Sequence, residues 1–109
     1  MATHWMDECG RRWRVPAKGK RIQYSNAGPR ALRAFVYRRD DFACVKCGWR
    51  PPFVPVGYDG QFTLIGPDVN GSRRELQIDH VVPLIAGGTN HPDNLQTLCF
   101  GCNASKRDR

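Results

Sequence analysis

Two identical cysteine pairs constrain this chain of 109 residues more than any other feature. Two residues separate Cys44 from Cys47 and Cys99 from Cys102, and 51 residues lie between the two pairs. One tight turn can present both sulfurs of such a pair, and four thiolates suit a tetrahedral Zn²⁺ ion. Zinc ribbons place about 15–20 residues between their pairs, so a larger segment is inserted here. We predict a closed structural zinc site that clamps both ends of this segment, with a redox motif or a coincidence of spacing as the alternatives.

The compartment follows from what the sequence lacks. The first residues contain no apolar stretch like that of a secretory signal, and no apolar run approaches the ~18 residues of a membrane span. We therefore expect a cytoplasmic chain without a membrane partner, in which cysteines stay reduced and bind metal. The fifth cysteine, Cys9, is either a thiol activated by the nearby Arg11 and Arg12 or a free thiol in an N-terminal arm.

The chain shows one clear helix before the first cysteine pair. Pro29 suits the first position of a helix, which we expect to end near residues 40–41. An apolar stripe at helical spacing is formed by Leu32, Phe35 and Val36, whereas Arg33, Tyr37 and Arg38 lie mainly off it. Residues 1–28 contain scattered aromatic residues, glycine and proline, and we predict that they form a largely irregular arm.

The segment between the cysteine pairs reads as a small antiparallel sheet. Asp59-Gly60 and Asn70-Gly71 are hairpin-turn signals, each between short apolar stretches. The last strand runs into Asp79-His80 and ends before Pro83, and a terminal helix is expected from Asn103 to Arg107. The fold class predicted from these elements is α+β.

Four polar residues beside and between the cysteine pairs have a shared chemical use. Asp79 and Asn103 offer hard oxygen ligands suited to Mg²⁺. A histidine can accept a proton from water at neutral pH, so His80 is a candidate base, and a metal, a base and water together hydrolyse phosphodiesters. Taken singly, His80 reads as a packed or surface histidine, Asn94 as a turn residue and Asn103 as a helix cap. His91 is either a phosphate or metal contact or an ordinary loop residue.

Taken together, these residues resemble the HNH endonuclease family, which has the ββα-metal fold. The resemblance covers roughly residues 29–107, and its elements occur in the order of the family. The matching residues are Arg39-Asp40, the run from Cys44 to Gly48, Asp79 to Leu84, Gly87-Gly88, Asn94 to Cys99, Cys102-Asn103 and Lys106. The zinc pairs bracket the motif, and the resemblance implies an HNH nuclease domain over residues 29–109.

The resemblance implies a role for each residue of the motif. His80 would be the general base, and Asp79 and Asn103 would bind the catalytic divalent ion. Asn94 would hold the loop so that His80 is aimed correctly. Asn103 stands where the family name implies a third histidine, and an amide oxygen there favours Mg²⁺ or Mn²⁺ over a softer ion.

Charge is concentrated at the N-terminus. The chain carries a net charge of +7, and residues 1–39 hold ten basic and two acidic residues, a net charge of +8. Cationic side chains near phosphates supply affinity that does not depend on sequence, although such a stretch is often only a solvated face or tail. The predicted DNA contacts are Arg11, Arg12, Arg14, Lys18, Lys20 and Arg21 in the arm, with Lys106 and Arg107 in the terminal helix.

These observations combine into one functional expectation. We predict a monomeric, metal-dependent endonuclease that nicks or cuts double-stranded DNA with weak sequence specificity, holding structural Zn²⁺ and catalytic Mg²⁺ or Mn²⁺. The resemblance to small bacteriophage and prophage members implies a setting in phage DNA packaging, with the terminase as a partner. The alternatives are a zinc-stabilised DNA-binding module without catalysis and a nuclease subunit whose specificity lies elsewhere.

Overall fold

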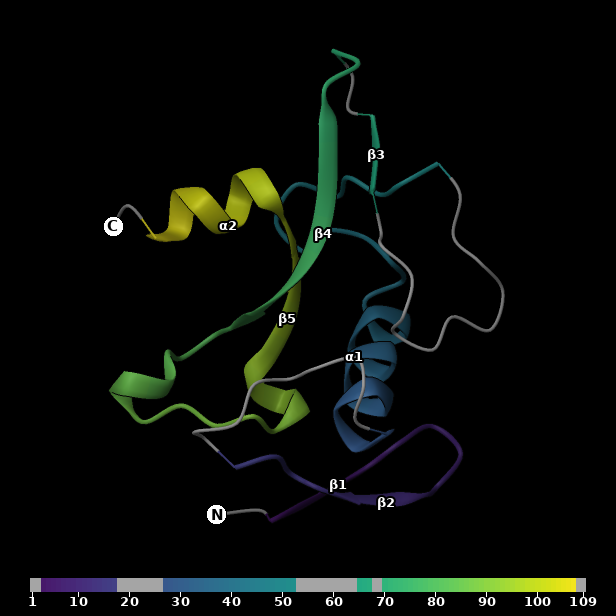
Figure 1. Ribbon diagram of the computed structural model, residues 1–109, viewed down its shortest axis with the longest axis vertical. Coiled ribbons are helices and arrows are strands. Elements are labelled where there is room, and N and C mark those ends of the chain that lie inside the picture. Colours follow the sequence, from purple (N-terminus) through teal and green to yellow (C-terminus); the bar gives the residue numbers. More distant parts are fainter. Residues whose placement is uncertain (1–2, 18–26, 53–64, 68–69, 108–109) are drawn as a thin grey trace.

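The computed structural model describes residues 3–17, 27–52, 65–67 and 70–107 (Figure 1). These residues form an α+β fold with two antiparallel sheets and two α-helices, which confirms the predicted fold class. Within this part of the chain no helix is long and apolar enough to cross a membrane. In chain order the elements are β1 (His4–Met6), β2 (Arg12–Arg14), α1 (Ala27–Arg39), β3 (Ile65–Pro67), β4 (Arg73–His80), the 3₁₀ turns η1 (Leu84–Ala86) and η2 (Pro92–Asn94), β5 (Leu95–Cys99) and α2 (Phe100–Arg107).

The central sheet has the strand order β3–β4–β5. Strands β3 and β4 form the hairpin predicted from Asn70-Gly71, and Gly71 has a φ of +77°, which glycine adopts without strain. Strands β4 and β5 pair from Leu76 opposite Cys99 to His80 opposite Leu95. This pairing brings the second cysteine pair and the Asp79-His80 dipeptide onto one rigid unit. The other predicted turn, at Asp59-Gly60, lies outside the described residues.

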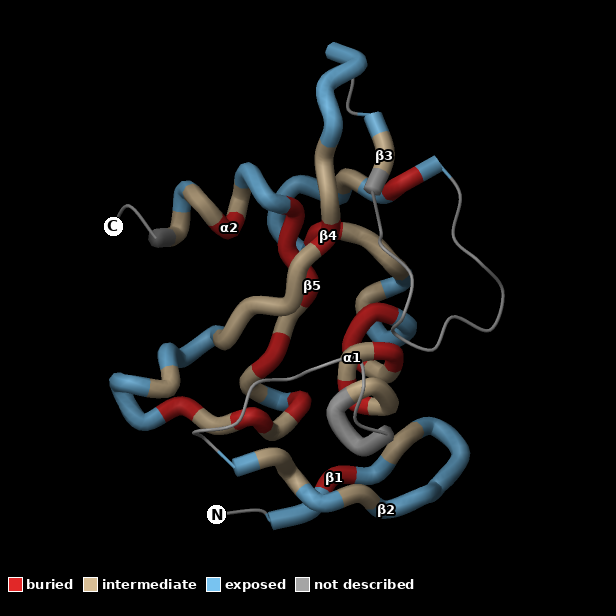
Figure 2. Tube along the Cα trace, in the orientation of Figure 1, coloured by how far each residue is buried: buried red, intermediate tan, exposed pale blue. Residues whose placement is uncertain are grey.

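Helices α1 and α2 lie on opposite sides of strands β4 and β5 (Figure 1). Buried positions gather along β5 and on the inner side of α1 (Figure 2). Leu32 and Val36 of the predicted stripe are fully buried. Tyr37, expected to lie mainly off the stripe, is also buried, because a second apolar cluster with Cys44, Leu76 and Leu98 covers it.

The end of α1 is tied to β5 by polar contacts. The guanidinium of Arg39 donates to the carbonyl oxygens of Pro92 at 2.8 Å and Leu95 at 2.6 Å. The carboxylate of Asp40 accepts a hydrogen bond of 2.9 Å from the backbone N–H of Thr97. These contacts fix β5, and with it the start of α2, against the first helix.

A β-hairpin stands where the sequence predicted a largely irregular arm. Trp5 on β1 pairs with Trp13 on β2, and Trp5 is only 3% exposed because it packs against Leu32, Val36 and Leu95. The carboxylate of Asp7 organises the turn by accepting from the N–H groups of Cys9 and Arg11 and from the Trp13 indole. Two strands of three residues give too short a pattern to reveal this hairpin in the sequence, whereas the packing of Trp5 stabilises it.

Candidate active site and zinc cluster

The four predicted zinc ligands come together where β5 meets α2. The Sγ atoms of Cys44, Cys47, Cys99 and Cys102 all lie within 4.8 Å of one another. The first pair sits in a tight turn, in which the N–H of Gly48 donates to the Cys44 carbonyl at 2.9 Å and Gly48 has a φ of +80°. Helix α2 begins at Phe100, earlier than the predicted Asn103, so Cys102 belongs to the first turn of the helix.

The electrostatics of this cluster favour a bound cation. Desolvation opposes ionisation of Cys44, but N–H groups of Cys47, Cys99 and Lys46 outweigh it and lower the pKa of the Cys44 thiol to about 6. Burial and the neighbouring sulfurs raise the pKa of Cys102 to about 12. The Arg74 guanidinium lies 3.9 Å from the sulfurs of both Cys47 and Cys99. Because four thiolates this close repel one another unless a cation lies between them, the donor set fits Zn²⁺.

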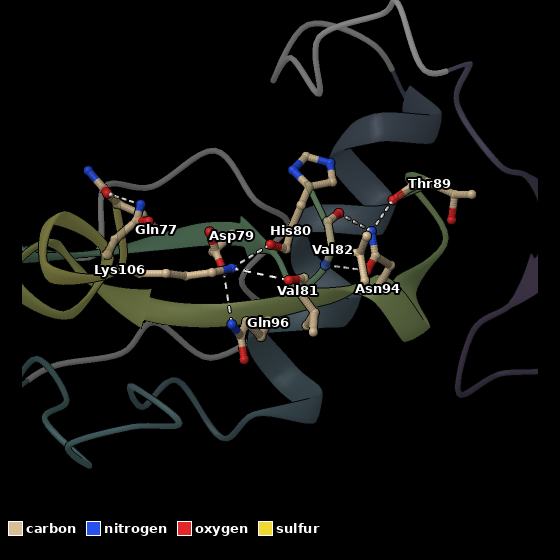
Figure 3. A network of polar contacts seen from close by, with 10 residues as sticks. Gln77, Asp79, His80, Val81, Val82, Thr89, Asn94, Gln96 and Lys106 are labelled. Atoms are coloured by element: carbon tan, nitrogen blue, oxygen red, sulfur yellow. Dashed lines mark hydrogen bonds and ion pairs between the residues drawn. The ribbon is translucent and has the colours of Figure 1, made fainter. Parts of the chain in front are cut away.

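At the other end of β4, the Asn94 side chain pins the loop that follows His80. Its Oδ1 accepts from the N–H of Val82 at 2.8 Å, and its Nδ2 donates to the carbonyls of Val82 at 3.0 Å and Thr89 at 2.8 Å (Figure 3). Asn94 therefore ties together the two sides of the loop after β4, and its role in aiming His80 stays a prediction.

The glycine pair of the motif makes this loop possible. Gly87 has a φ of +98° and closes the turn η1. A Cβ on Gly88 would meet the Val82 carbonyl oxygen at 1.9 Å and Asn94 Nδ2 at 2.8 Å. Position 88 therefore accepts only glycine while Asn94 holds the loop.

His80 ends β4, and its imidazole points away from the Lys106 ammonium group (Figure 3). Its Nε2 lies 2.7 Å from Oδ1 of Asn90. Nδ2 of Asn90 lies 3.2 Å and 3.0 Å from the carbonyl oxygens of Pro16 and Ala17. The predicted base is thus connected through one amide to the segment that follows the N-terminal hairpin.

Asp79 is in direct contact with a cation of the protein itself. Its Oδ2 lies 2.6 Å from Nζ of Lys106 and accepts from the side-chain amide of Gln96 at 2.9 Å. Lys106 Nζ also donates to the His80 carbonyl at 2.6 Å. The lysine expected to contact DNA therefore lies against the predicted metal ligand, and its contact with DNA stays a prediction.

A chain of amides orients Asn103, which is only 6% exposed. The Glu75 carboxylate accepts from Nε2 of Gln77 at 2.8 Å, so Oε1 of Gln77 is the atom that meets Nδ2 of Asn103 at 2.8 Å. The amide nitrogen of Asn103 thus faces Gln77, so Oδ1 is the atom that could bind a cation, and the metal role of Asn103 stays a prediction.

Three predicted site residues, Asp79, His80 and Asn103, line one cleft of about 470 Å³, whereas Asn94 does not line it. Lys106 also lines the cleft, with Ile78, Pro83 and Leu84 as apolar neighbours. Asp79 and Asn103 supply one carboxylate and one amide oxygen, which are hard ligands, and the cleft leaves space for water. This donor set fits a hydrated divalent ion such as Mg²⁺.

The predicted DNA contacts of the arm are described only in part. Arg12 and Arg14 are exposed on β2, on either side of the inward-facing Trp13. The Arg11 guanidinium lies 4.1 Å from the centre of the Trp13 ring. Lys18, Lys20 and Arg21 lie outside the described residues, and Arg107 is in the last turn of α2 without a described side chain.

Four other residues had no settled role in the sequence. Asn90 and Gln77 orient His80 and Asn103, but an isolated amide in a loop or strand carries no spacing signal. His91 accepts from the N–H of Asp93 at 3.0 Å and caps η2, which agrees with its reading as a loop residue. Cys9 is an exposed free thiol.

Comparison with known proteins supports the expected family. The family model of the HNH endonucleases matches residues 66–109. The type IV methyl-directed restriction enzyme EcoKMcrA of Escherichia coli is 26% identical over 90 residues, which are 83% of this chain and 27% of that enzyme. The chain thus corresponds to about a quarter of the length of this relative. No solved structure gives a significant match.

Proposed function

We propose that this chain, whose residues 66–109 belong to the HNH endonuclease family, hydrolyses phosphodiester bonds of double-stranded DNA in the cleft at the end of β4. The observation that carries the proposal is the convergence of Asp79, His80 and Asn103 on that cleft, beside a loop pinned by Asn94. The match to the HNH endonuclease family model supports the reaction class, and these side chains supply the groups that it needs.

The chain's own residues have separate tasks in this reaction. His80 accepts the proton of the attacking water through a ring nitrogen. Asp79 and Asn103 would hold a Mg²⁺ or Mn²⁺ ion, which when bound polarises the scissile phosphate and stabilises the leaving oxygen. Asn94 keeps the loop after β4 in place, and the four cysteines fix the start of α2, which carries Asn103.

The same proposal includes the DNA contacts, the specificity and the cellular context of the enzyme. Arg11, Arg12 and Arg14 track the DNA backbone together with Lys18, Lys20, Arg21, Lys106 and Arg107. Phosphate contacts of this kind carry no sequence information, so intrinsic specificity is weak. A single set of Asp79, His80 and Asn103 in each chain suits nicking by a monomer in the cytoplasm, and a phage packaging role beside a terminase fits such an enzyme.

The test is cleavage of supercoiled plasmid by the zinc-loaded protein with Mg²⁺, Mn²⁺ or Ni²⁺. His80→Ala should lower the rate about 10²–10⁴-fold, as expected for loss of a general base, and should keep the zinc. His91→Asn is the matched control, because it replaces a neighbouring histidine with another good capping residue and should cut like wild type.

Two results would refute the proposal. A wild-type protein that leaves the plasmid intact with all three ions, yet binds it, would favour the non-catalytic zinc module. A His80→Ala variant that cuts as fast as wild type would remove His80 from the chemistry.

A further inference from the structure

Asn90 lies buried between the proposed base and the N-terminal segment. Its side chain is 1% exposed, with one end against His80 and the other against the backbone of Pro16 and Ala17. Buried amides are rarely left without partners, because a buried donor or acceptor that makes no hydrogen bond loses its hydration without compensation. The hydrogen bonds to Pro16 and Ala17 span 74 and 73 positions of the chain, so Asn90 joins two segments that are distant in sequence.

The donors and acceptors around Asn90 settle which way its amide faces. The carbonyl oxygens of Pro16 and Ala17 only accept hydrogen bonds, so the atom that faces both must be the Nδ2 group with its two hydrogens. The Oδ1 atom is then the one that lies 2.7 Å from His80 Nε2. An amide oxygen only accepts, and therefore Nε2 of His80 carries the hydrogen.

We propose that Asn90 is a positioning residue that holds His80 as the Nε2–H tautomer, so that Nδ1 carries the lone pair that accepts the proton from water. This proposal rests on the nuclease function proposed above. In a neutral imidazole only one ring nitrogen can act as a base, and the partner of the other nitrogen decides which one it is. The Asn90 oxygen also accepts from the imidazolium that forms when His80 takes up a proton.

Residues 3–17 at the N-terminus help to hold Asn90 in place. The N–H of Val15 donates to the Thr3 carbonyl at 2.9 Å, and Val15 packs beside Trp5, so the hairpin sets the course of the chain into Pro16 and Ala17. Their carbonyls hold the Asn90 amide, and the amide holds His80. Pro16 and Ala17, which follow the proposed DNA contacts on β2, therefore also support the proposed base through Asn90.

The direct test is the protonation of the two ring nitrogens of His80, measured by nitrogen NMR on the zinc-loaded full chain. We expect the wild-type Nδ1 resonance at the position of an unprotonated nitrogen and Nε2 at that of a protonated one. The reverse pattern in the wild type would overturn the proposal without any variant. This readout requires no cleavage, so it fails or succeeds separately from the plasmid test of His80→Ala.

Variants of Asn90 distinguish positioning of the His80 tautomer from a merely structural role, in which Asn90 only bridges the loop to Pro16 and Ala17. Asn90→Ala removes the acceptor and should mix the two tautomers, lowering kcat about 10–100-fold with an unchanged KM for plasmid, because second-layer partners have effects of this size. Asn90→Asp keeps an acceptor for Nε2–H but sets a carboxylate against two carbonyls. Positioning predicts that Asp retains the wild-type tautomer and Ala loses it, whereas bridging predicts that Asp is the more damaging change.

The control variant is Thr89→Ala, which removes a side-chain hydrogen bond of 3.2 Å from the N–H of His91 in the same loop. It should keep the His80 tautomer and most of kcat. An Asn90→Ala protein with wild-type nitrogen resonances would show that Asn90 does not position the base. If Asn90→Ala does not fold, the wild-type resonances still decide the question.

Discussion

Strand β4 serves two sites that are built on different principles. Near Leu76 it pairs with Cys99, beside four identical thiols held within 4.8 Å of one another. At His80 it reaches an open cleft lined by unlike groups. The thiols are placed by the tight turn at Cys44 and Cys47 and by the junction of β5 with the first turn of α2. In the cleft region, Asn90, Asn94 and Asn103 each need neighbours to decide which end of the amide faces its partner. A closed site can thus be specified by spacing, whereas an open one depends on orientation.

The adjacent residues Cys102 and Asn103 allow the sharpest test of this contrast. Structural zinc contributes about 10–16 kcal/mol of binding free energy in small finger peptides, which equals or exceeds the ~5–15 kcal/mol that stabilises a whole domain. Cys102→Ser should therefore lose zinc and unfold the domain, as judged by metal analysis and circular dichroism. Cys9→Ser, at an exposed thiol outside the cluster, is the control and should keep both.

Asn103→Ala should leave the zinc and the fold in place but lower plasmid cleavage. Loss of a ligand oxygen or of its orienting partner typically costs about 10–100-fold in metal affinity or activity. The measurement is the cleavage rate over a titration of Mg²⁺, with zinc content determined on the same sample. If Asn103→Ala lost as much zinc as Cys102→Ser, the cysteine cluster and the cleft would not be separate sites.

Replacement of the exposed arginines of the hairpin should weaken DNA binding and leave the cysteine cluster and the cleft unchanged. Replacing Arg11, Arg12 and Arg14 together by Gln keeps Trp5 and the hairpin core intact, whereas deletion of the hairpin would expose Leu32 and Val36. For every phosphate that the variant no longer neutralises, the slope of log K against log salt should fall by about 0.9. An unchanged slope would place the DNA away from β2.

Lys106→Met should lower the Mg²⁺ concentration needed for half-maximal cleavage by several-fold. The ammonium lies 2.6 Å from the Asp79 carboxylate and competes with a divalent ion for that negative charge. A variant that needs more Mg²⁺ than wild type would show that the lysine assists the ion.

The smallest effect is expected at Asp7, far from both sites. The indole of Trp13 is the largest cause that lowers the pKa of Asp7, and with the N–H groups of Arg11 and Cys9 it outweighs desolvation. A lowered pKa means that this contribution to stability is complete above about pH 4 and is lost as pH falls further. The difference in unfolding free energy between wild type and Asp7→Asn, measured by urea titration, should therefore shrink below about pH 4. A constant difference from pH 7 to pH 3 would contradict it.

The sequence was most informative where identity and spacing determine the chemistry. The clustering of the four cysteines, the hairpin at Asn70-Gly71 and the burial of Leu32 and Val36 are confirmed. It did not reveal the N-terminal hairpin, because strands of three residues show no periodicity and are stabilised by the distant contacts of Trp5. The hydrogen bond from Asn90 to Ala17 was also not predictable from the sequence. It joins residues 73 positions apart and depends on which end of the Asn90 amide faces the carbonyl oxygen.

Strand β4 sets a fixed spacing between the cysteine cluster and His80. His80, which pairs with Leu95, lies four positions along β4 from Leu76, which pairs with Cys99. Four positions are about 13 Å along an antiparallel strand. Cobalt(II), which takes the same tetrahedral thiolate site as zinc, is paramagnetic. A cobalt-loaded protein would therefore report on the His80 ring from a fixed distance, and the metal that holds the fold together would become a spectroscopic probe of the residue proposed to start the reaction.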